Sequence, residues 1–172
     1  NLLKESQEAL ANFDVSQLKS TSEKKAFWIN AYNFCVLSIL NQHRKSSSVM
    51  DVQGFKDQIL CKVAKQEMNL LLMESEILRA EFKDPRLHLV LWWGCKSSPR
   101  LNPQIYRAKD LEKQIEAQVK RTLSRKDFVD ATKTELKVSS LFSWYQADFR
   151  NYKGKVLGFI KTYRADIPSK PK

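Results

Sequence analysis

The stretch Ser20-Thr-Ser-Glu-Lys-Lys-Ala-Phe-Trp-Ile-Asn-Ala-Tyr-Asn-Phe-Cys-Val-Leu-Ser-Ile-Leu-Asn-Gln42 decides the fold. It opens with Ser20 followed by Glu23, a hydroxyl residue with an acid three positions later, which is the capping-box pattern of a helix N-terminus. A helix from Glu23 to about Gln42 would be apolar on nearly every side, so we expect it to be central and buried. Its apolar residues are Ala26, Phe27, Ile29, Phe34, Val36, Leu37, Ile39 and Leu40.

The whole 172-residue chain has the composition of one globular domain. It is 42% apolar and 28% charged, and its four Trp, five Tyr and nine Phe can build a core, which excludes a disordered chain. Four Gly and five Pro are too few for a collagen-like or linker protein. No transmembrane segment is predicted, because polar residues interrupt the longest apolar stretch, and spanning a membrane takes about 20 apolar residues.

Periodicity and turn residues on both sides of the central helix predict an α+β fold. We expect a single compact helix-rich domain over residues 1–172, with a small sheet around the buried central helix. The expected helices are Asn1–Asn12, Val52–Ile59, Asn69–Ala80, Asp110–Ser124, one from Ser139 or Ser140 to Phe149, and Lys153–Tyr163. The expected strands are Leu60–Gln66, Arg86–Trp93 and a hairpin within Asp127–Val138.

The charge of +11 is concentrated in the second half of the chain. Residues 1–86 hold 12 basic and 11 acidic side chains, whereas residues 87–172 hold 18 and 8. Either a solvated lysine-rich surface or a site for an acidic protein or polyanion would explain this asymmetry. Four cations at the end of the expected 110–124 helix would form such a site, although cations are also favoured there by the helix dipole. They are Lys120, Arg121, Arg125 and Lys126.

The three cysteines, Cys35, Cys61 and Cys95, have no CxxC spacing. We therefore predict neither a zinc site nor a disulfide scaffold, and expect no metal and no cofactor. One disulfide pair remains open. The chain begins at Asn1 rather than Met, which is consistent with a processed or trimmed product.

Two asparagines interrupt the central apolar helix although Asn is a poor helix former. Asn30 and Asn33 are three residues apart and share a helix face. Buried amides must be hydrogen-bonded, so they either bind the backbone of neighbouring loops or line a pocket and donate to a ligand. We predict that Asn30 and Asn33 form a binding site together with three other residues, Trp28, Tyr32 and Arg79, which we call the predicted binding set.

His88 lies among aliphatic residues and is either a core histidine or a general base. In the second case Cys95 or Ser98 would be the nucleophile, and Glu74 would orient the imidazole ring. Glu74 and Arg79 are five residues apart, which is a poor spacing for an ion pair on an α-helix, so we expect Arg79 to bind another carboxylate such as Asp84. We expect Asn30, Asn33, Glu74, Arg79 and His88 to lie in one neighbourhood, because mutual satisfaction offsets the cost of burying them.

Five blocks of the sequence, in order over about residues 10–165, resemble the domain-of-unknown-function 547 family. They are Ala26-Phe-Trp-Ile-Asn-Ala-Tyr-Asn33, Leu70-Leu-Leu-Met-Glu-Ser-Glu-Ile-Leu-Arg79, Asp84-Pro-Arg-Leu-His-Leu-Val-Leu91, Ser97-Ser-Pro-Arg-Leu101 and Leu141-Phe-Ser-Trp-Tyr-Gln-Ala-Asp-Phe149. The residues that match the family motifs are Trp28, Asn30, Tyr32, Asn33, Glu74, Arg79, His88, Pro99, Trp144, Asp148 and Phe149. The resemblance implies no settled activity.

The chain departs from the pattern of many relatives, which carry one Cys near the end of the expected strand and another just before the proline. Here Trp93 and Ser98 stand in those places, and Cys95 lies between them. A serine needs a better base than a cysteine does, so any cysteine chemistry of the family would be impaired. This favours a non-catalytic or degenerate binding or scaffolding module with a basic C-terminal half over a Cys/His- or Ser/His-dependent hydrolase or acyl-transferase.

The resemblance also bears on location. Bacterial members that resemble this chain are often exported. Together with the absent initiator Met, this favours the cell envelope or export, with an organelle matrix after transit-peptide removal as the alternative.

Overall fold

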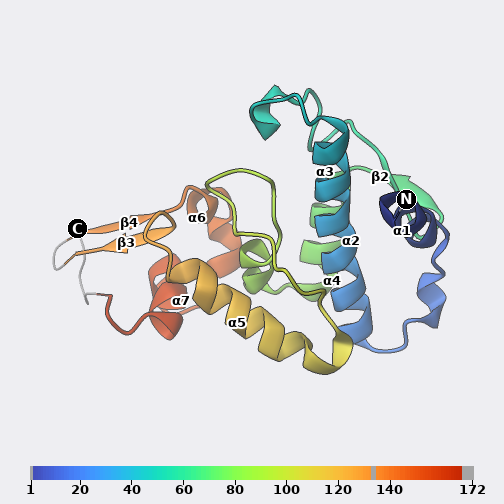
Figure 1. Ribbon diagram of the computed structural model, residues 1–172. Coiled ribbons are helices and arrows are strands. Elements are labelled where there is room, and N and C mark those ends of the chain that lie inside the picture. The colour runs from blue at the N-terminus through green and yellow to red at the C-terminus, as the bar shows by residue number, and fades with distance from the viewer. Residues whose placement is uncertain (1, 133–134, 168–172) are drawn as a thin grey trace.

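The long helix α2 (Thr21–Gln42) is the central element of the computed structural model, which describes residues 2–132 and 135–167 (Figure 1). The predicted capping box is present. The Ser20 side chain accepts a hydrogen bond from the Glu23 amide, and the Glu23 carboxylate accepts one from the Ser20 amide. The prediction that this helix is buried was wrong at Leu37, which is 41% exposed. Phe34 is only half-buried.

The other elements are mostly short helices, which confirms a helix-rich α+β domain. In Figure 1, α1 and the β1–β2 hairpin lie on one side of α2, and the C-terminal helices and the β3–β4 hairpin lie on the other. The bounds are α1 (Leu2–Asn12), β1 (Cys61–Val63), β2 (Gln66–Met68), α3 (Leu70–Leu72), α4 (Ala80–Phe82), α5 (Leu111–Leu123), β3 (Val129–Ala131), β4 (Leu136–Val138), α6 (Leu141–Trp144) and α7 (Lys155–Tyr163).

The small sheets are two antiparallel hairpins. In the first, Cys61 pairs with Met68, and the turn residues Ala64 and Lys65 have positive φ. The amides of these two turn residues donate to Leu10 O and Ala11 O at 2.9 and 2.6 Å, which fixes the hairpin to the end of α1. The predicted strand over Leu60–Gln66 is thus confirmed only at Cys61–Val63, because the chain turns at Ala64 and Lys65 and Gln66 begins the second strand. The hairpin predicted within 127–138 is confirmed where the structure describes it, with Val129 opposite Val138.

The prediction of a strand over Arg86–Trp93 is wrong. Pro85–Leu89 forms a 3-10 helix instead, which Asp84 caps by accepting a hydrogen bond from the Arg86 amide. After this helix, the Asn33 side chain binds Val90 O at 3.3 Å and the Trp92 amide at 2.8 Å. These backbone groups therefore bond to a side chain rather than to a neighbouring strand, and the run stays buried without a sheet.

Two predicted helices also differ from the structure. Residues 52–59 form turns, and the helix expected up to Phe149 is divided into α6 and a 3-10 helix, Gln146–Phe149. The helix expected over Asn69–Ala80 is helical but is mostly a π-helix, Met73–Arg79. The remaining helices follow the predictions closely, and the stripe of α5 is fully buried at Leu111, Ile115, Val119 and Leu123.

A single apolar cluster extends from Ala26 in α2 to Ile167 near the C-terminus. The last part of the chain joins it through aromatic rings, with the Phe149 and Phe159 centroids 4.8 Å apart. Within residues 2–132 and 135–167, no helix combines the length and the apolar character needed to cross a membrane.

Candidate binding pocket

A π-helix, Met73–Arg79, follows α3 without a break and positions two charged residues. Asn69 begins this helical segment as predicted, because its side chain accepts a hydrogen bond from the Leu72 amide at 2.8 Å. Hydrogen bonds in a π-helix join residues five apart, so residues at that spacing lie on the same side. Glu74 and Arg79 consequently line the same cavity, although their spacing would separate them on an α-helix.

Arg79 and His88 both bind Asp148. The Arg79 guanidinium makes two hydrogen bonds to this carboxylate, of 2.8 and 3.0 Å, and His88 Nε2 lies 2.7 Å from Asp148 Oδ2. The prediction that Arg79 binds Asp84 was wrong, because Asp84 binds Lys25 and Arg86 instead. Arg79 lowers the pKa of Asp148, and burial lowers the pKa of His88. We therefore expect a neutral His88 at pH 7 whose Nε2–H donates to the carboxylate, which can only accept.

Glu74 lies on the other side of the His88 ring and is only 2% exposed. Its Oε2 is 2.9 Å from Lys56 Nζ, and its Oε1 is 4.0 Å from His88 Nδ1. Neither Glu74 Oε2 nor His88 Nδ1 has a hydrogen-bond partner among the described residues, since the Lys56 contact has the distance but not the geometry of one. Lys56 Nζ does donate to the Tyr145 hydroxyl, at 3.1 Å.

These charged groups lie beside a cavity of about 640 Å³ with aromatic walls. Five aromatic side chains line it: Tyr32, Phe55, Trp93, Trp144 and Tyr145. Trp93 stacks with Trp144 at 5.7 Å between centroids. Large apolar side chains remain exposed around the opening, at Met50 (86%), Trp144 (60%) and Leu71 (43%). This size and this mostly apolar lining with a few charged groups are typical of small-molecule sites.

The residues predicted for catalysis are not in contact with one another as a triad would be. His88 is 1% exposed and is covered by the Tyr145 ring, which stacks on it at 3.8 Å. Cys95 lines the cavity, and its Sγ lies 3.3 Å from Ser97 Oγ. The buried Ser98 hydroxyl bonds to the carbonyl oxygens of Cys95 and Pro99, at 2.8 and 3.1 Å. Among the described residues no hydrogen bond joins His88 to Cys95 or Ser98.

The two α2 asparagines bind loop backbone, the first of the alternatives open from the sequence, and both also border a cavity of about 340 Å³. Asn30 forms a reciprocal pair with Tyr106, donating to its carbonyl at 2.8 Å and accepting from its amide at 2.9 Å. Asn33 donates to the Val90 carbonyl and accepts a hydrogen bond from the Trp92 amide. The five polar residues that were expected in one neighbourhood are therefore separated. Of the five, only Glu74, Arg79 and His88 come together.

The other members of the predicted binding set lie apart. Tyr32 and Arg79 line the aromatic cavity, whereas Trp28 is 9% exposed and packs edge-on against Phe27. No three His, Cys, Asp or Glu side chains in the described parts of the chain converge to hold a metal ion.

Sequence reasoning left five residues out of the site: Lys56, Trp93, Trp144, Tyr145 and Asp148. The block Leu141–Phe149 carried a signal for three of them, because it matches a family motif. Nothing in the sequence around Lys56 singles that lysine out, since it lies in a segment that forms only turns.

The four cations at the end of α5 divide into two kinds. The Arg125 guanidinium donates to Ser98 O at 2.9 Å and Lys96 O at 3.1 Å and pairs with Asp127, so it holds a loop in place. Arg121 donates to Leu101 O at 3.3 Å. Lys120 and Lys126 are exposed and form no ion pair within the described residues.

Comparison with known proteins identifies the family. Residues 15–123, more than half of the chain, match the family model described as "Protein of unknown function, DUF547", and the chain belongs to this family. The match covers α2, the π-helix and His88, whereas Tyr145 and Asp148 lie beyond it. Comparison with curated proteins and with solved structures gave no match.

Proposed function

We propose that the chain is a binding module, and that its aromatic cavity takes a small amphipathic molecule with an apolar body and an anionic end. One observation carries this proposal: the cations at the cavity are more exposed than the carboxylates that balance them. The Lys56 and Arg79 side chains are 39% and 36% exposed, whereas Glu74 is 2% and Asp148 26% exposed. A ligand that enters therefore meets positive charge first.

The walls of the cavity fit the apolar part of such a ligand. Trp93 and Trp144 offer stacked rings, and Lys56 lies over the Trp93 ring at 5.2 Å from its centroid. Aromatic contacts add about 0.5–1.5 kcal/mol beyond the burial of apolar area. An anion that displaces Lys56 from Glu74 would remain close to the ring on which the apolar body stacks.

The contacts of His88 give no support to the alternative of a Cys/His or Ser/His hydrolase. A general base needs to be within about 2.6–3.2 Å of its nucleophile, directly or after a small movement. Here one ring nitrogen donates to Asp148, and the other faces Glu74 beneath the Tyr145 ring. We infer that His88 positions Tyr145 and Asp148 at the edge of the cavity.

The basic C-terminal half remains a proposed second surface, for an acidic protein or polyanion. Of its four predicted cations, Lys120 and Lys126 support the idea, because both are exposed and not used by the fold. Arg121 and Arg125 support this second surface less, because both bind backbone carbonyls.

Titration with 1-anilinonaphthalene-8-sulfonate, an aromatic anion whose fluorescence rises in apolar surroundings, tests the cavity. Trp144→Ala removes a wall, and we expect it to weaken binding roughly tenfold, or about 1.4 kcal/mol. Leu2→Ala is the matched control, because Leu2 is an exposed apolar residue that lies outside the aromatic cavity. Equal affinities for both variants and the parent protein would show that the probe binds elsewhere and would refute the proposal.

A further inference from the structure

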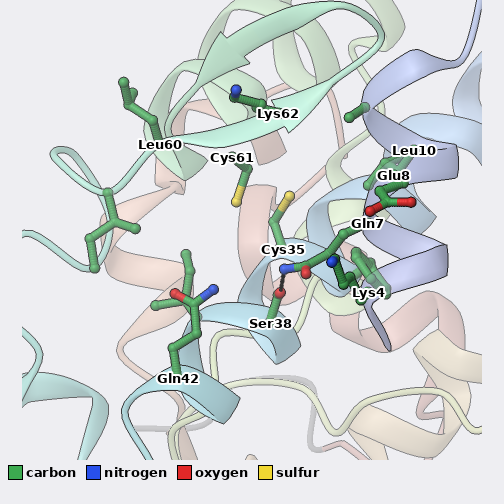
Figure 2. A pocket seen from close by; sticks show the side chains of 14 residues that line it. Lys4, Gln7, Glu8, Leu10, Cys35, Ser38, Gln42, Leu60, Cys61 and Lys62 are labelled. Atoms are coloured by element: carbon green, nitrogen blue, oxygen red, sulfur yellow. Dashed lines mark hydrogen bonds between the residues drawn. The ribbon is translucent and has the colours of Figure 1, made fainter. Parts of the chain in front are cut away.

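A second cavity, of about 350 Å³, lies between α1, α2 and the strand β1, and two cysteines line it. Figure 2 shows the sulfur atoms of Cys35 and Cys61 pointing toward each other inside it. Cys35 comes from the middle of α2 and Cys61 from the first position of β1. A hydrogen bond from Gln7 to the Ser38 hydroxyl joins α1 to α2 next to the pair (Figure 2).

The two sulfurs face each other and are not equivalent (Figure 2). The neighbouring Cys61 raises the pKa of Cys35, and the neighbouring Cys35 lowers the pKa of Cys61. Cys35 is 2% exposed, whereas Cys61 is partly exposed toward the cavity. A thiolate with access to solvent is the nucleophile in thiol oxidation, so Cys61 has the position to react first and Cys35 to react second.

Regular elements hold both cysteines. The β1–β2 turn is fixed to the end of α1 by the amides of Ala64 and Lys65, and β1 pairs with β2 at Cys61. The two sulfurs thus face each other from elements that the fold holds in place (Figure 2). Cys95 lies apart from them and lines the aromatic cavity.

We propose that Cys35 and Cys61 form a dithiol that a hydroperoxide oxidises to a disulfide. The Cys61 thiolate attacks one peroxide oxygen, the O–O bond breaks, and the leaving alkoxide or hydroxide takes up a proton. Cys61 is then a sulfenic acid. The Cys35 sulfur displaces the hydroxyl group, the S–S bond forms, and water leaves with the Cys35 proton. Overall the two thiols lose two electrons, and the peroxide is reduced to an alcohol or water and a further water.

The disulfide would fasten α2 to the β1–β2 hairpin across the chain segment between residues 35 and 61. Closing that loop restricts the unfolded chain, so oxidation is expected to raise the melting temperature by roughly 5–10 °C. The bond would also form one wall of the second cavity and so reduce its access to solvent.

Hydrogen peroxide treatment of the whole chain tests the proposal, using alkylation and peptide mapping under denaturing conditions. The parent protein and Cys95→Ser should each lose two alkylatable thiols, gain one intramolecular Cys35–Cys61 link, and recover both thiols with dithiothreitol. The proposal is overturned if three thiols persist in the parent, if sulfur gains oxygen without a link, or if the link joins two chains.

The Cys35→Ser variant tests the order of the two steps. Without its partner, the Cys61 sulfenic acid should persist and be trapped by dimedone, whereas Cys61→Ser should give no adduct at Cys35. If Cys35→Ser fails to fold, the melting temperature of Cys95→Ser with peroxide and with dithiothreitol decides instead. An unchanged melting temperature contradicts the proposed link.

Discussion

Two groups of polar side chains lie against the core, and their hydrogen-bonding groups are satisfied in different ways. On α2, Asn30 and Asn33 each use both ends of the amide to bind loop backbone. Around His88, in contrast, carboxylates and cations bind one another, and two buried atoms, Glu74 Oε2 and His88 Nδ1, have no hydrogen-bond partner among the described residues.

We infer from this difference a structural role for the first group and, under the proposed function, a ligand-binding role for the second. An amide whose nitrogen and oxygen both bind loop backbone contributes to stability by holding that backbone in place. An incompletely paired cluster costs stability, and this cost is tolerated at sites that bind or react. The second group also borders the aromatic cavity, whereas the first holds the loops that follow Leu89 and Pro103.

The largest expected effect is on the first group. Asn33→Ala removes the partners of Val90 O and the Trp92 amide, and we expect the free energy of unfolding in urea to fall by about 2–4 kcal/mol. Asn12→Ala, on the exposed face of α1, is the control and should cost less than about 0.5 kcal/mol. A loss below about 1 kcal/mol for Asn33→Ala would mean that the loop does not depend on this amide.

A smaller stability effect is expected in the second group. Arg79→Met breaks the two-bond contact with Asp148, which is partly exposed to solvent. We expect a loss of about 1 kcal/mol of unfolding free energy, together with weaker binding of the anilinonaphthalene sulfonate probe. Arg79→Lys should restore the charge but not the paired geometry, and so only part of the stability. Full recovery in the lysine variant would argue against the geometry described for Asp148.

The pH dependence of stability should come partly from His88. Because burial lowers its pKa below 6.5, the unfolded chain takes up a proton on His88 before the folded chain does. The stability present above about pH 6.5 is therefore lost as the pH falls toward the folded pKa, by at most about 1.4 kcal/mol per pH unit.

His88→Gln tests this pH dependence, because His43 is common to both proteins. The unfolding free energy of the variant should change less between about pH 7 and about pH 5.5 than that of the parent. Asp148, whose pKa is also lowered, loses its contribution only below its ordinary value of 3.8, outside this window. Parallel pH curves for the two proteins would contradict a neutral buried His88.

The smallest effects on folding are expected at the basic surface. Lys120→Glu with Lys126→Glu should change the unfolding free energy by less than about 0.5 kcal/mol and should weaken retention on an anionic matrix. Arg125→Glu is unsuitable for this purpose, because Arg125 binds two loop carbonyls and its loss would destabilise the fold. Unchanged retention of the double lysine variant would leave these lysines as ordinary solvated surface.

The sequence predicted those parts of the fold that local signals specify. The capping box at Ser20, the Asn69 cap and the stripe of α5 were all correct, because short-range hydrogen bonds and periodicity determine them. The prediction of a strand over Arg86–Trp93 was wrong, because its β-forming residues are buried by contacts with Asn33 and with other distant residues rather than by a sheet.

The candidate site was predicted in part, through Glu74, Arg79 and His88. Asp148, the common partner of Arg79 and His88, could not be located from spacing, since it is far away in the sequence and reaches them only in the folded chain. The π-helix was also missed, and it is the reason why residues five apart lie on one side.

The central claim is that Lys56, released from Glu74, receives the anionic end of a ligand in the aromatic cavity. It is tested most directly by comparing Lys56→Met with the parent protein in titrations of two probes that share a naphthylamine body. One is 1-anilinonaphthalene-8-sulfonate, and the other is N-phenyl-1-naphthylamine, which lacks the sulfonate. We expect the variant to bind the sulfonate probe about fivefold more weakly, or about 1 kcal/mol, and the neutral probe as well as the parent does. Equal losses for both probes, or no loss for either, would contradict the claim.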